Sequence, residues 1–482
     1  MADEDKNLFK ALKKYSRKNV LPMHMPGHKR NTTMAKYLKD LGANLDITEI
    51  SGFDDLHDAK AILANAMEHC ADIWRSEEAY FLVNGSTCGI LAGIAGATKY
   101  GDEIIVARNC HKSVYHAIEL FGLKPTFITP PVDEKYGIAA SIRPKDVKSA
   151  IAQHPKAKLV VITSPTYEGV ISDLPYIAEI AHEQWIPLMV DEAHGAHLGF
   201  SPMFLGGAVA AGADIVVQSL HKTLPSLTQT AIAHLNGVLV DSAKFRRQLN
   251  IFETSSPSYL LMASIDQCVE LLEAKSAVLF ANWEDALSAF NLQVKKLKNL
   301  RIFMYGADYF VNHEDIFRFD PSKIVISTIN TNINACQLGK ILLNDYQIEL
   351  ETTAGSHAIA MTGLGDTKDS LHRLGEAICA IDQTLTFEDS APDPYSLFYI
   401  PPRDYGVTQV LNSEYVILDI NQTLNETAAD YVWAYPPGIP LITPGERVTQ
   451  NFIDAAVNLT LQGVNLKCSM GGSLPRMRVL KK

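Results

Sequence analysis

The chain has 482 residues, of which 47% are hydrophobic and 20% are charged, and its formal net charge at pH 7 is −11. This composition is typical of a folded globular protein with about two to four domains. The negative charge argues against non-specific binding to nucleic acid or to an anionic membrane surface, and no apolar run reaches the roughly 18 residues that a membrane-spanning helix needs.

Seven cysteines are scattered along the chain without a C-x-x-C pair. An odd number of dispersed cysteines favours free thiols in a reducing compartment. The first residues, 1–6, are mostly charged, and no apolar segment follows them, so no signal peptide is expected. We therefore expect a cytoplasmic protein.

The predicted elements begin with a short amphipathic helix over residues 7–19 and a Pro- and Gly-rich loop over 21–29. From about residue 56, short apolar runs alternate with helical segments, among them a buried helix of small residues over 88–98. This alternation is typical of α/β proteins in which helices cover both faces of a mostly parallel sheet. The strands are expected at 79–83, 103–107, 158–163, 187–190, 214–218 and 230–235.

A long helical stretch over 258–300 follows the predicted sheet and leads to a second region, 301–385, where strands and helices alternate again. Prolines at 392, 394, 401 and 402 indicate a further boundary. We therefore expect an α/β fold with one large domain and smaller C-terminal α/β parts. The predicted division is an N-terminal segment (1–55), a large domain (56–285), a small α/β domain (286–390) and a C-terminal domain (391–482).

The most informative residues are Asp191 and Lys222. Each follows an apolar run, 186–190 and 214–218 respectively, and they are 31 positions apart (222 − 191). Pyridoxal-phosphate enzymes use such a pair, because the lysine forms a Schiff base with the cofactor aldehyde and the carboxylate keeps the pyridine nitrogen protonated. The sequence therefore predicts pyridoxal 5′-phosphate as the cofactor, bound in the large domain.

The segment Asn84-Gly85-Ser86-Thr87 lies between a predicted strand and a predicted helix. Backbone N–H groups, the helix dipole and two hydroxyl groups favour an anion at such a place. The alternative is an ordinary helix N-cap, since Ser and Thr are common there. Beside the predicted cofactor lysine, we interpret Ser86 and Thr87 as phosphate-binding residues.

His221 directly precedes Lys222, Ser219 lies two residues before His221, and both are placed to hold a phosphate or to transfer protons. The alternative for His221 is a structural histidine. His111 follows the strand at 103–107, on the side of an α/β sheet where ligands bind, and its ring is suited to stack on a planar cofactor. A helix-capping or solvated histidine is the alternative there.

The run 191–197 allows two other interpretations. It contains the letters of a helicase DEAH box, but no G-x-x-x-x-G-K-[ST] loop accompanies it, since Gly339-Lys340 is followed by isoleucine. It also offers Asp191, His194 and His197 as metal ligands, although this spacing is weak evidence for a metal without a clear second shell. We rank both below the cofactor interpretation and expect no metal.

Together the motifs resemble those of the bacterial ornithine/lysine/arginine decarboxylases, which are pyridoxal-phosphate enzymes of the aspartate-aminotransferase fold (fold type I). They follow one another in a consistent order along nearly the whole chain. The matching segments are MPGHK (25–29), NGST (84–87), HKS (111–113), DEAH (191–194), SLHK (219–222), TSSP (254–257), YPPG (435–438) and PGE (444–446).

The resemblance implies roles for the matching residues. Lys222 would carry the cofactor, Asp191 would contact its pyridine nitrogen and His111 would stack on its ring. His194 would lie beside the cofactor, at a position where some longer members have tryptophan. The resemblance further implies phosphate binding by Ser86, Thr87, Ser219 and His221, and it makes Lys222, Asp191, His221 and His111 the predicted catalytic residues.

Two residues are implied to act outside this cofactor set. Ser255 would reach the phosphate of the other subunit, so the protein would be a homodimer, or a higher homo-oligomer, with a shared active site. Glu446 is the candidate for binding the distal cationic group of the substrate. Only 24 residues precede the MPGHK segment, so the chain resembles the short members that lack a wing domain, and the decamer of the long members is not implied.

The resemblance predicts decarboxylation of a basic L-amino acid to the corresponding amine, as in polyamine biosynthesis. Arginine is slightly favoured over lysine and ornithine, because short members often resemble biosynthetic arginine decarboxylases. The alternatives are an aminotransferase or an acyl-CoA-dependent synthase of the same fold, and, in another class, a regulator that binds the cofactor without catalysis.

Overall fold

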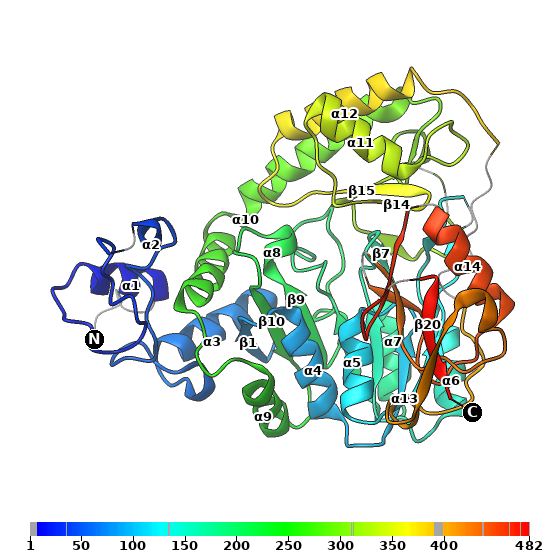
Figure 1. The fold of residues 1–482 in the computed structure, drawn as a ribbon. Coiled ribbons are helices and arrows are strands. Elements are labelled where there is room, and N and C mark those ends of the chain that lie inside the picture. Colours follow the sequence, from blue (N-terminus) through cyan, green and yellow to red (C-terminus); the bar gives the residue numbers. More distant parts are fainter. Residues whose placement is uncertain are drawn as a thin grey trace.

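The computed structural model describes residues 7–34, 36–133, 135–309, 311, 313–389, 399–435, 438–461, 463–472 and 474–481. Pro436 and Pro437 of the YPPG motif and the predicted boundary at 390/391 lie outside these residues. The fold is α/β, as the sequence predicts (Figure 1). The four-part division of the chain stays a prediction.

A seven-stranded sheet lies at the centre of the molecule, in the order β1-β10-β9-β8-β6-β2-β3. Strands β9, β8, β6, β2 and β3 are parallel to one another, whereas β10 is antiparallel to both of its neighbours. All six predicted strands are present, within two residues of the expected bounds. They are β1 (Glu78–Leu82), β2 (Glu103–Ala107), β6 (Val160–Thr163), β8 (Leu188–Asp191), β9 (Ile215–Ser219) and β10 (Ala231–Leu235).

The seventh strand, β3 (Lys124–Ile128), was not predicted from the sequence pattern. It contains Pro125, which has no N–H group to donate to a neighbouring strand. Such a strand is tolerated at the edge of a sheet, where one side needs no partner. In the structure β3 is indeed the last strand and pairs with β2 alone.

Helix α4 (Gly85–Ala97) packs directly on the sheet because it is built largely of small residues. A Cβ atom at Gly89 would lie 2.7 Å from Leu82 Cδ1, and one at Gly93 would lie 2.9 Å from Met189 Cε. Larger side chains at these glycines would push the helix away from the strands. The close packing therefore holds the first turn of α4, which contains Ser86, near the carboxyl ends of the parallel strands.

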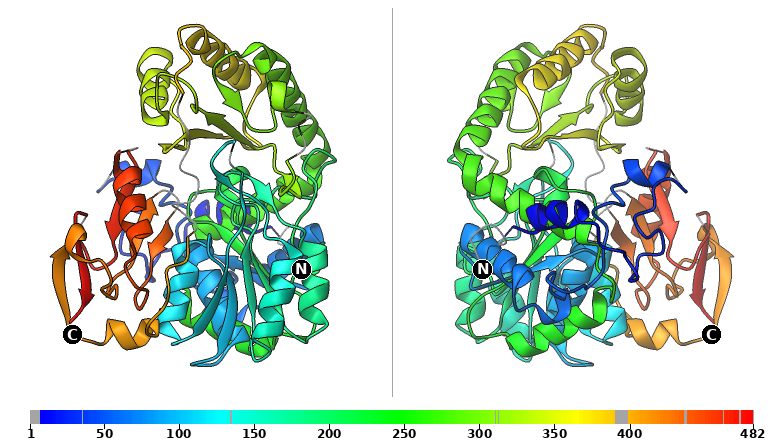
Figure 2. Two further views of the ribbon diagram at one scale, coloured as in Figure 1. Left: turned by 90° about the vertical axis from the view of Figure 1, so that its right-hand side faces the viewer. Right: turned by 90° about the vertical axis from the view of Figure 1, so that its left-hand side faces the viewer.

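Further helices cover both faces of the sheet (Figure 2). Their apolar sides merge with the buried strands into two large cores. They are α3 (Ile62–Trp74), α5 (Lys112–Leu120), α6 (Pro144–Gln153), α7 (Leu174–His182) and α9 (Ser242–Phe252).

Helix α10 (Tyr259–Gln293) joins this body to a second, four-stranded sheet at the top of Figure 1. Its N-cap residue is Ser258, whose side chain accepts a hydrogen bond from the N–H of Leu261. It ends seven residues before the predicted limit of 300, where a short 3₁₀ turn takes over. The sheet has the order β11-β13-β15-β14 and comprises β11 (Arg301–Ile302), β13 (Lys323–Ser327), β14 (Thr352–Ala354) and β15 (His357–Met361), with α11 (Ala335–Tyr346) and α12 (Lys368–Asp382) beside it.

The C-terminal residues form a third group of elements with a small core of their own, whereas α13 packs into the core of the central sheet. Their strands make a three-stranded and a two-stranded sheet. The elements are α13 (Val407–Leu411), β16 (Tyr415–Asp419), β17 (Val432–Tyr435), β18 (Ile439–Ile442), α14 (Gln450–Leu461), β19 (Asn465–Cys468) and β20 (Arg476–Leu480). Shorter elements elsewhere are α2 (Tyr37–Asp40), β4 (Val132–Asp133), β5 (Ile138–Ala139), β7 (Val170–Ile171) and β12 (Arg318–Phe319).

The N-terminal helix α1 (Leu8–Ser16) is shorter than the predicted 7–19 and lies on one side of the body (Figure 1). Leu8 and Leu12 are buried, and the N–H of Leu8 donates to Asp266 Oδ2 on α10 over 3.0 Å. The loop that follows exposes apolar side chains, including Leu21, Met23 and Met25 of the MPGHK region. Within the described ranges, no helix is both long and apolar enough to cross a membrane.

His234 on β10 gives the fold a specific sensitivity to acid. Its ring is buried between the Ser76 hydroxyl, 2.8 Å from Nδ1, and the Gln218 side-chain carbonyl, 3.2 Å from Nε2. Burial lowers the pKa of His234 from 6.5 to about 3. Between these values the unfolded chain binds a proton that the folded chain does not, so the stability contributed by the neutral ring is complete above the unfolded pKa and is lost as pH falls.

Because of His234, we expect the free energy of unfolding of the wild-type protein to fall by about 2 kcal/mol as the pH is lowered from about 7 to about 5. A His234→Gln variant should therefore show a shallower pH dependence in urea unfolding. His372→Gln is the control, because the side chain of His372 is 61% exposed. Equal pH slopes for wild type and His234→Gln would contradict the expectation.

Candidate active site

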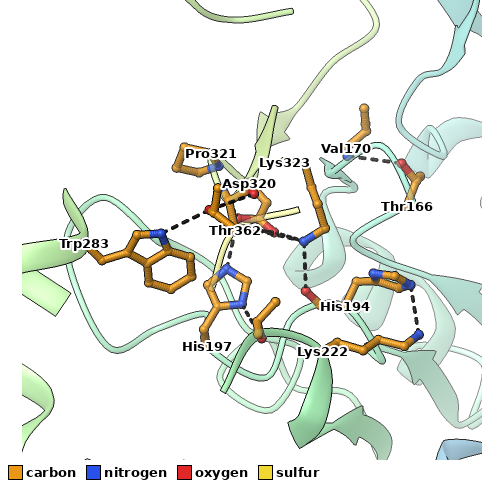
Figure 3. Close-up of polar contacts among 12 residues, drawn as sticks. Thr166, Val170, His194, His197, Lys222, Trp283, Asp320, Pro321, Lys323 and Thr362 are labelled. Carbon is orange, nitrogen blue, oxygen red and sulfur yellow. Dashed lines mark hydrogen bonds and ion pairs between the residues drawn. The ribbon is translucent and has the colours of Figure 1, made fainter. Parts of the chain in front are cut away.

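Lys222 lies on a single helical turn, α8 (Leu220–Thr223), immediately after β9. Its Nζ atom is 2.9 Å from Nε2 of His194 (Figure 3). Burial lowers the pKa of Lys222, and the nearby Asp191 carboxylate opposes this effect without cancelling it. A lysine with a lowered pKa holds more of its amine in the neutral form, which is the nucleophilic form.

Asp191 is the last residue of β8, the strand beside β9, and is 2% exposed. Because β8 and β9 are parallel, their carboxyl ends meet at the same edge of the sheet. One carboxylate oxygen accepts a hydrogen bond from the N–H of Ala193 over 3.2 Å. Burial raises the pKa of Asp191, and Lys222 opposes the rise. The structure thus brings together the carboxylate and the amine that are 31 positions apart in the sequence (222 − 191).

A cavity lies above this edge of the sheet. Five of the predicted site residues line it, namely Ser86, His111, Asp191, His194 and Lys222, and five do not, namely Thr87, Ser219, His221, Ser255 and Glu446. The other lining residues are Asn109, Ala139, Thr163, Thr166, Tyr167, Glu168, Ala193 and Ile439. They follow several different strands, which is the usual construction of a ligand site in an α/β sheet.

His111 both caps a helix and faces the cavity. It precedes α5, and its Nδ1 atom accepts the N–H of Ser113 over 3.3 Å and lies 2.9 Å from the Ser113 hydroxyl. Burial lowers the pKa of His111 to about 3, and the charges of Lys222 and Lys112 add to the effect. The capping that was the alternative interpretation is therefore present, and the neutral ring still lies at the cavity wall.

The predicted phosphate-binding residues lie on neighbouring turns. Ser86 is in the first turn of α4, and the preceding turn is held by the Glu253 carboxylate, which accepts the N–H groups of Val83 and Asn84. Thr87 is exposed on the same helix. Ser255, two residues after Glu253, is also exposed and lines no part of the cavity in the single chain.

The segment before Lys222 contributes a buried hydroxyl group. Ser219 is fully buried, and its Oγ has no hydrogen-bond partner among the described residues. His221 is partly buried and donates from Nδ1 to the carbonyl oxygen of Thr230 over 2.9 Å. This bond leaves Nε2 of His221 as the ring nitrogen that accepts a proton.

Four buried polar atoms at or beside the cavity have no partner in the part of the chain that the structure describes. They are Asn109 Oδ1, Thr163 Oγ1, His194 Nδ1 and Ser219 Oγ. A buried polar atom without a hydrogen bond costs roughly 1–3 kcal/mol, so such atoms are rare and call for an explanation. Their clustering here indicates that the cavity is built to bind a polar ligand.

Glu446 has a different place from the one expected. It is fully buried, its carboxylate accepts from Nη1 and Nη2 of Arg108 over 2.9 and 3.0 Å, and Arg403 donates to it over 3.1 Å. The N–H of Thr443 adds a fourth bond of 2.8 Å. Glu446 does not line the cavity, so we reinterpret it as the counter-ion of two arginines rather than a ligand of the substrate.

The sequence interpretation missed residues at the end of β6 and in the loop that follows it. Thr163, Tyr167 and Glu168 line the cavity, and the Tyr167 ring meets the His194 ring edge-on at 5.2 Å. The Tyr167 hydroxyl donates to Glu351 over 2.9 Å. The sequence did contain a signal for these residues, because they lie at the carboxyl end of an apolar strand, as Asp191 does.

The alternative metal site at 191–197 is not supported by the geometry. Both ring nitrogens of His197 are engaged, Nδ1 with the hydroxyl of Thr223 at 3.1 Å and Nε2 with the carboxylate of Asp320 at 3.0 Å. Among the residues that the structure describes, no group of three or more His, Cys, Asp or Glu side chains is arranged to hold a metal ion.

The sequence profile of the Orn/Lys/Arg decarboxylase major domain matches residues 6–337, and the profile of the C-terminal domain of the same family matches residues 401–459. The chain belongs to this family. The family that the motifs resemble is therefore confirmed, and membership makes the chain an amino acid decarboxylase.

Relatives with assigned activities match over the whole chain. An arginine decarboxylase of Bacillus subtilis is 30% identical, with 100% of this chain and 99% of that protein covered. An arginine decarboxylase of Bacillus anthracis is also 30% identical, over 98% of this chain and 97% of that protein. The inducible lysine decarboxylase of Escherichia coli is 23% identical over 97% of this chain and 78% of that protein.

Solved structures confirm the predicted fold class, that of the fold-type I enzymes. A lysine decarboxylase from Francisella novicida superimposes with a TM-score of 0.83 at 19% identity, over 99% of this chain and 82% of that one. A ureidoglycine–glyoxylate aminotransferase from Bacillus subtilis superimposes with a TM-score of 0.53 at 16% identity, over 68% and 87% of the two chains. At these identities the likeness concerns the fold.

Proposed function

We propose that the protein catalyses the pyridoxal-phosphate-dependent decarboxylation of a basic L-amino acid to the amine and carbon dioxide, with arginine slightly favoured over lysine and ornithine. The observation that carries the proposal is the meeting of Lys222 and Asp191 at one buried cavity. The leaning to arginine is supported by the relatives named arginine decarboxylase, whose lengths this chain covers almost completely.

The residues at the cavity fit pyridoxal phosphate. Lys222 offers an amine for the aldehyde, Asp191 offers a carboxylate for the ring nitrogen, and His111 offers a neutral ring for the face of the cofactor. The unpartnered hydroxyl of Ser219 is a donor that the phosphate would satisfy. We assign the phosphate to the group Ser86, Thr87, Ser219 and His221, and we place His194 beside the cofactor.

When bound, the cofactor withdraws the electron pair that stays on the substrate Cα as carbon dioxide leaves. The chain then has two tasks. The cavity must strip water from the substrate carboxylate, since a desolvated carboxylate loses carbon dioxide more readily. A proton must also reach Cα, and Lys222, whose Nζ lies in the cavity with a lowered pKa, is the acid we assign, with His221 as the alternative. One proton is consumed for each amine formed.

We expect Asp191→Asn to lower kcat by about 10²–10³-fold, the loss typical of one well-placed electrostatic stabiliser. The amide has nearly the same shape but no charge to hold the ring nitrogen in its protonated form. Steady-state kinetics on cofactor-saturated protein measures the effect. Asp285→Asn, at an exposed position of α10, is the control and should behave as wild type.

An aminotransferase is the nearest alternative, because aminotransferases share the fold. Such an enzyme normally binds the substrate α-carboxylate through an arginine, and the described lining of the cavity contains none. A synthase that uses acyl-CoA and a non-catalytic regulator are the remaining alternatives, and both differ from a decarboxylase in releasing no carbon dioxide from a basic amino acid.

The deciding experiment is to load the purified protein with cofactor and to offer arginine, lysine and ornithine separately. Equal amounts of amine and carbon dioxide from one of them would support the proposal and name the substrate. A protein that binds the cofactor but releases neither product from any of the three would contradict it. Keto-acid formation would favour the aminotransferase.

We infer a homodimer, or a higher homo-oligomer, with a shared active site and a cytoplasmic location. The exposed position of Ser255, away from the cavity of its own chain, is consistent with a role at the site of a second copy. None of the seven cysteines, all of which lie in the described ranges, forms a disulfide bond, which is consistent with a reducing compartment. The mass in solution, by light scattering, tests the oligomeric state.

A further inference from the structure

A buried polar cluster lies beside the Lys222–His194 contact (Figure 3). It consists of His197, Asp320 and Lys323, whose side chains are at most 1% exposed. Asp320 lies in the turn between β12 and β13, and Lys323 is the first residue of β13, a strand of the second sheet. None of the three lines the cavity.

The hydrogen bonds of the cluster have a defined direction. Asp320 is an acceptor, so Nε2 of His197 donates to its Oδ1 over 3.0 Å. In the neutral ring Nδ1 is then an acceptor, and the Thr223 hydroxyl, 3.1 Å away, donates to it. Lys323 Nζ donates to Asp320 Oδ2 over 3.1 Å and to the Ser322 hydroxyl over 2.7 Å. Burial alone would raise the pKa of Asp320, but His197 and Lys323 outweigh it and hold the pKa well below its usual range.

The two ends of the cluster reach the two chain segments that meet at the active site. At one end, Lys323 Nζ lies 3.5 Å from the main-chain carbonyl oxygen of His194. At the other end, His197 holds the side chain of Thr223, the residue next to Lys222. His194 Nε2 and Lys222 Nζ are 2.9 Å apart. The chain segments that carry these two residues therefore both contact the same buried cluster.

We propose that His197, Asp320 and Lys323 are positioning residues, which together set the geometry of His194 and Lys222 for the reaction. We call these three residues the clamp. The proposal deepens the proposed function, on which it rests, by adding residues that act through the cavity wall without touching substrate or cofactor.

Main-chain hydrogen bonds and close packing also join the clamp region to the loops around the cavity. The N–H of Asp320 donates to the carbonyl of Gly169 over 2.8 Å. Gly169 has φ +98°, and a Cβ atom there would lie 2.9 Å from Lys323 Cγ, so glycine is what lets the turn approach the loop after β6. On the other side, the N–H of Leu364 donates to the carbonyl of Thr223 over 2.9 Å. The second sheet therefore holds three loops of the cavity together.

The test separates positioning from simple support of the fold. Lys323→Met alone leaves the Asp320 charge buried without its cation, and we expect it to be destabilised. In the double variant Asp320→Asn/Lys323→Met both charges are removed, so most of the melting temperature should return, because a buried pair replaced by neutral groups is often tolerated. The double variant still lacks the contact between Lys323 Nζ and the main-chain carbonyl oxygen of His194.

For the double variant we expect kcat to fall by about tenfold or more with KM changed by less than about threefold, since small misplacements of reacting groups cost this much. A second readout needs no turnover: the rate at which cyanate carbamylates Lys222 in cofactor-free protein, measured by peptide mass spectrometry. This rate should change by about threefold or more, while the exposed Lys275 in the same sample stays constant. A double variant with restored melting temperature and wild-type values in both readouts would overturn the proposal.

Thr223→Val removes the hydroxyl group that contacts His197, without leaving a buried charge unpaired. This variant tests the clamp if the double variant does not fold. We expect a melting temperature near wild type and a kcat about tenfold lower at similar KM. The matched control is Asp308→Asn, because Asp308 also contacts a histidine and a lysine, His313 and Lys135, away from the cavity lining. It should leave kcat and the labelling of Lys222 unchanged. Unchanged kcat in Thr223→Val would speak against the clamp.

Failure of the clamp and failure of the proposed function give different results. If the wild-type protein releases no amine from the three amino acids, the proposed reaction is refuted, and the cyanate labelling of Lys222 still reports on the clamp. If the wild-type protein is active and neither variant changes kcat or labelling, the clamp is refuted and the reaction stands.

Discussion

Replacing Lys222 with alanine is expected to lower kcat by at least about a thousandfold, the scale seen when an essential nucleophile is removed. Lys222 supplies the amine with a lowered pKa at the cavity, and in the proposed reaction that amine both binds the cofactor and returns a proton to the substrate. Alanine offers neither function. The measurement is amine formation from the preferred substrate at saturating cofactor, together with the visible absorption of the loaded protein.

The matched control is Lys275→Ala, because Lys275 is an exposed lysine on α10. Its activity should equal that of the wild type. The fold of Lys222→Ala should survive, since the residue lies at a cavity and supports no core; circular dichroism checks this point. A folded Lys222→Ala protein with more than about a tenth of wild-type kcat would remove the central residue of the proposed function.

Replacing Glu446 with alanine is expected to lower the free energy of unfolding by about 3–5 kcal/mol, the usual cost of leaving a buried ion without its partner. Arg108 has a fully buried side chain, and Glu446 is the carboxylate that both Arg108 and Arg403 contact. Loss of that carboxylate would leave the Arg108 guanidinium buried without an anion. Chemical denaturation of the wild-type and variant proteins measures the difference.

Asp404→Ala is the control from the same part of the chain, because the partner of Asp404 is Arg447, whose side chain is 46% exposed. Exposed pairs contribute about 0–1 kcal/mol, so this variant should lose little stability. The two interpretations of Glu446 also differ in kinetics. If Glu446→Ala kept wild-type stability and raised KM for a cationic substrate instead, Glu446 would be the substrate ligand that the family resemblance suggests.

The buried ion pair of Glu446 is a feature that the sequence could not predict. The PGE motif marks the residue as one of interest, but its partner Arg108 lies 338 positions away. No local sequence pattern indicates that Arg108, directly after β2, and Glu446, in the C-terminal part of the chain, form an ion pair in the interior. The clamp is a second case, because His197 and Asp320 are 123 positions apart, and Lys323 reads from the sequence as an ordinary lysine at the start of a strand.

The central sheet and the Lys222–Asp191 pair were predictable for a physical reason. Strands buried on both faces must be short continuous apolar runs, and the residue after such a run lies at the carboxyl edge of a parallel sheet, where ligands bind. Both properties depend on neighbours in the sequence alone. The strand that was missed, β3, is an edge strand, where burial is weaker and a proline is tolerated.

The sequence by itself therefore determined the fold class and the family, and it predicted the amine and the carboxylate of the proposed chemistry, because each depends on local periodicity or on a short motif. Tertiary structure alone decided which charges neutralise one another, which hydroxyl groups are left unpartnered at the cavity, and which buried residues lie against the segments of His194 and Lys222. These outcomes depend on burial and on distances between side chains far apart in the chain, where the energy of a charge or a hydrogen bond is set by the surroundings it is folded into.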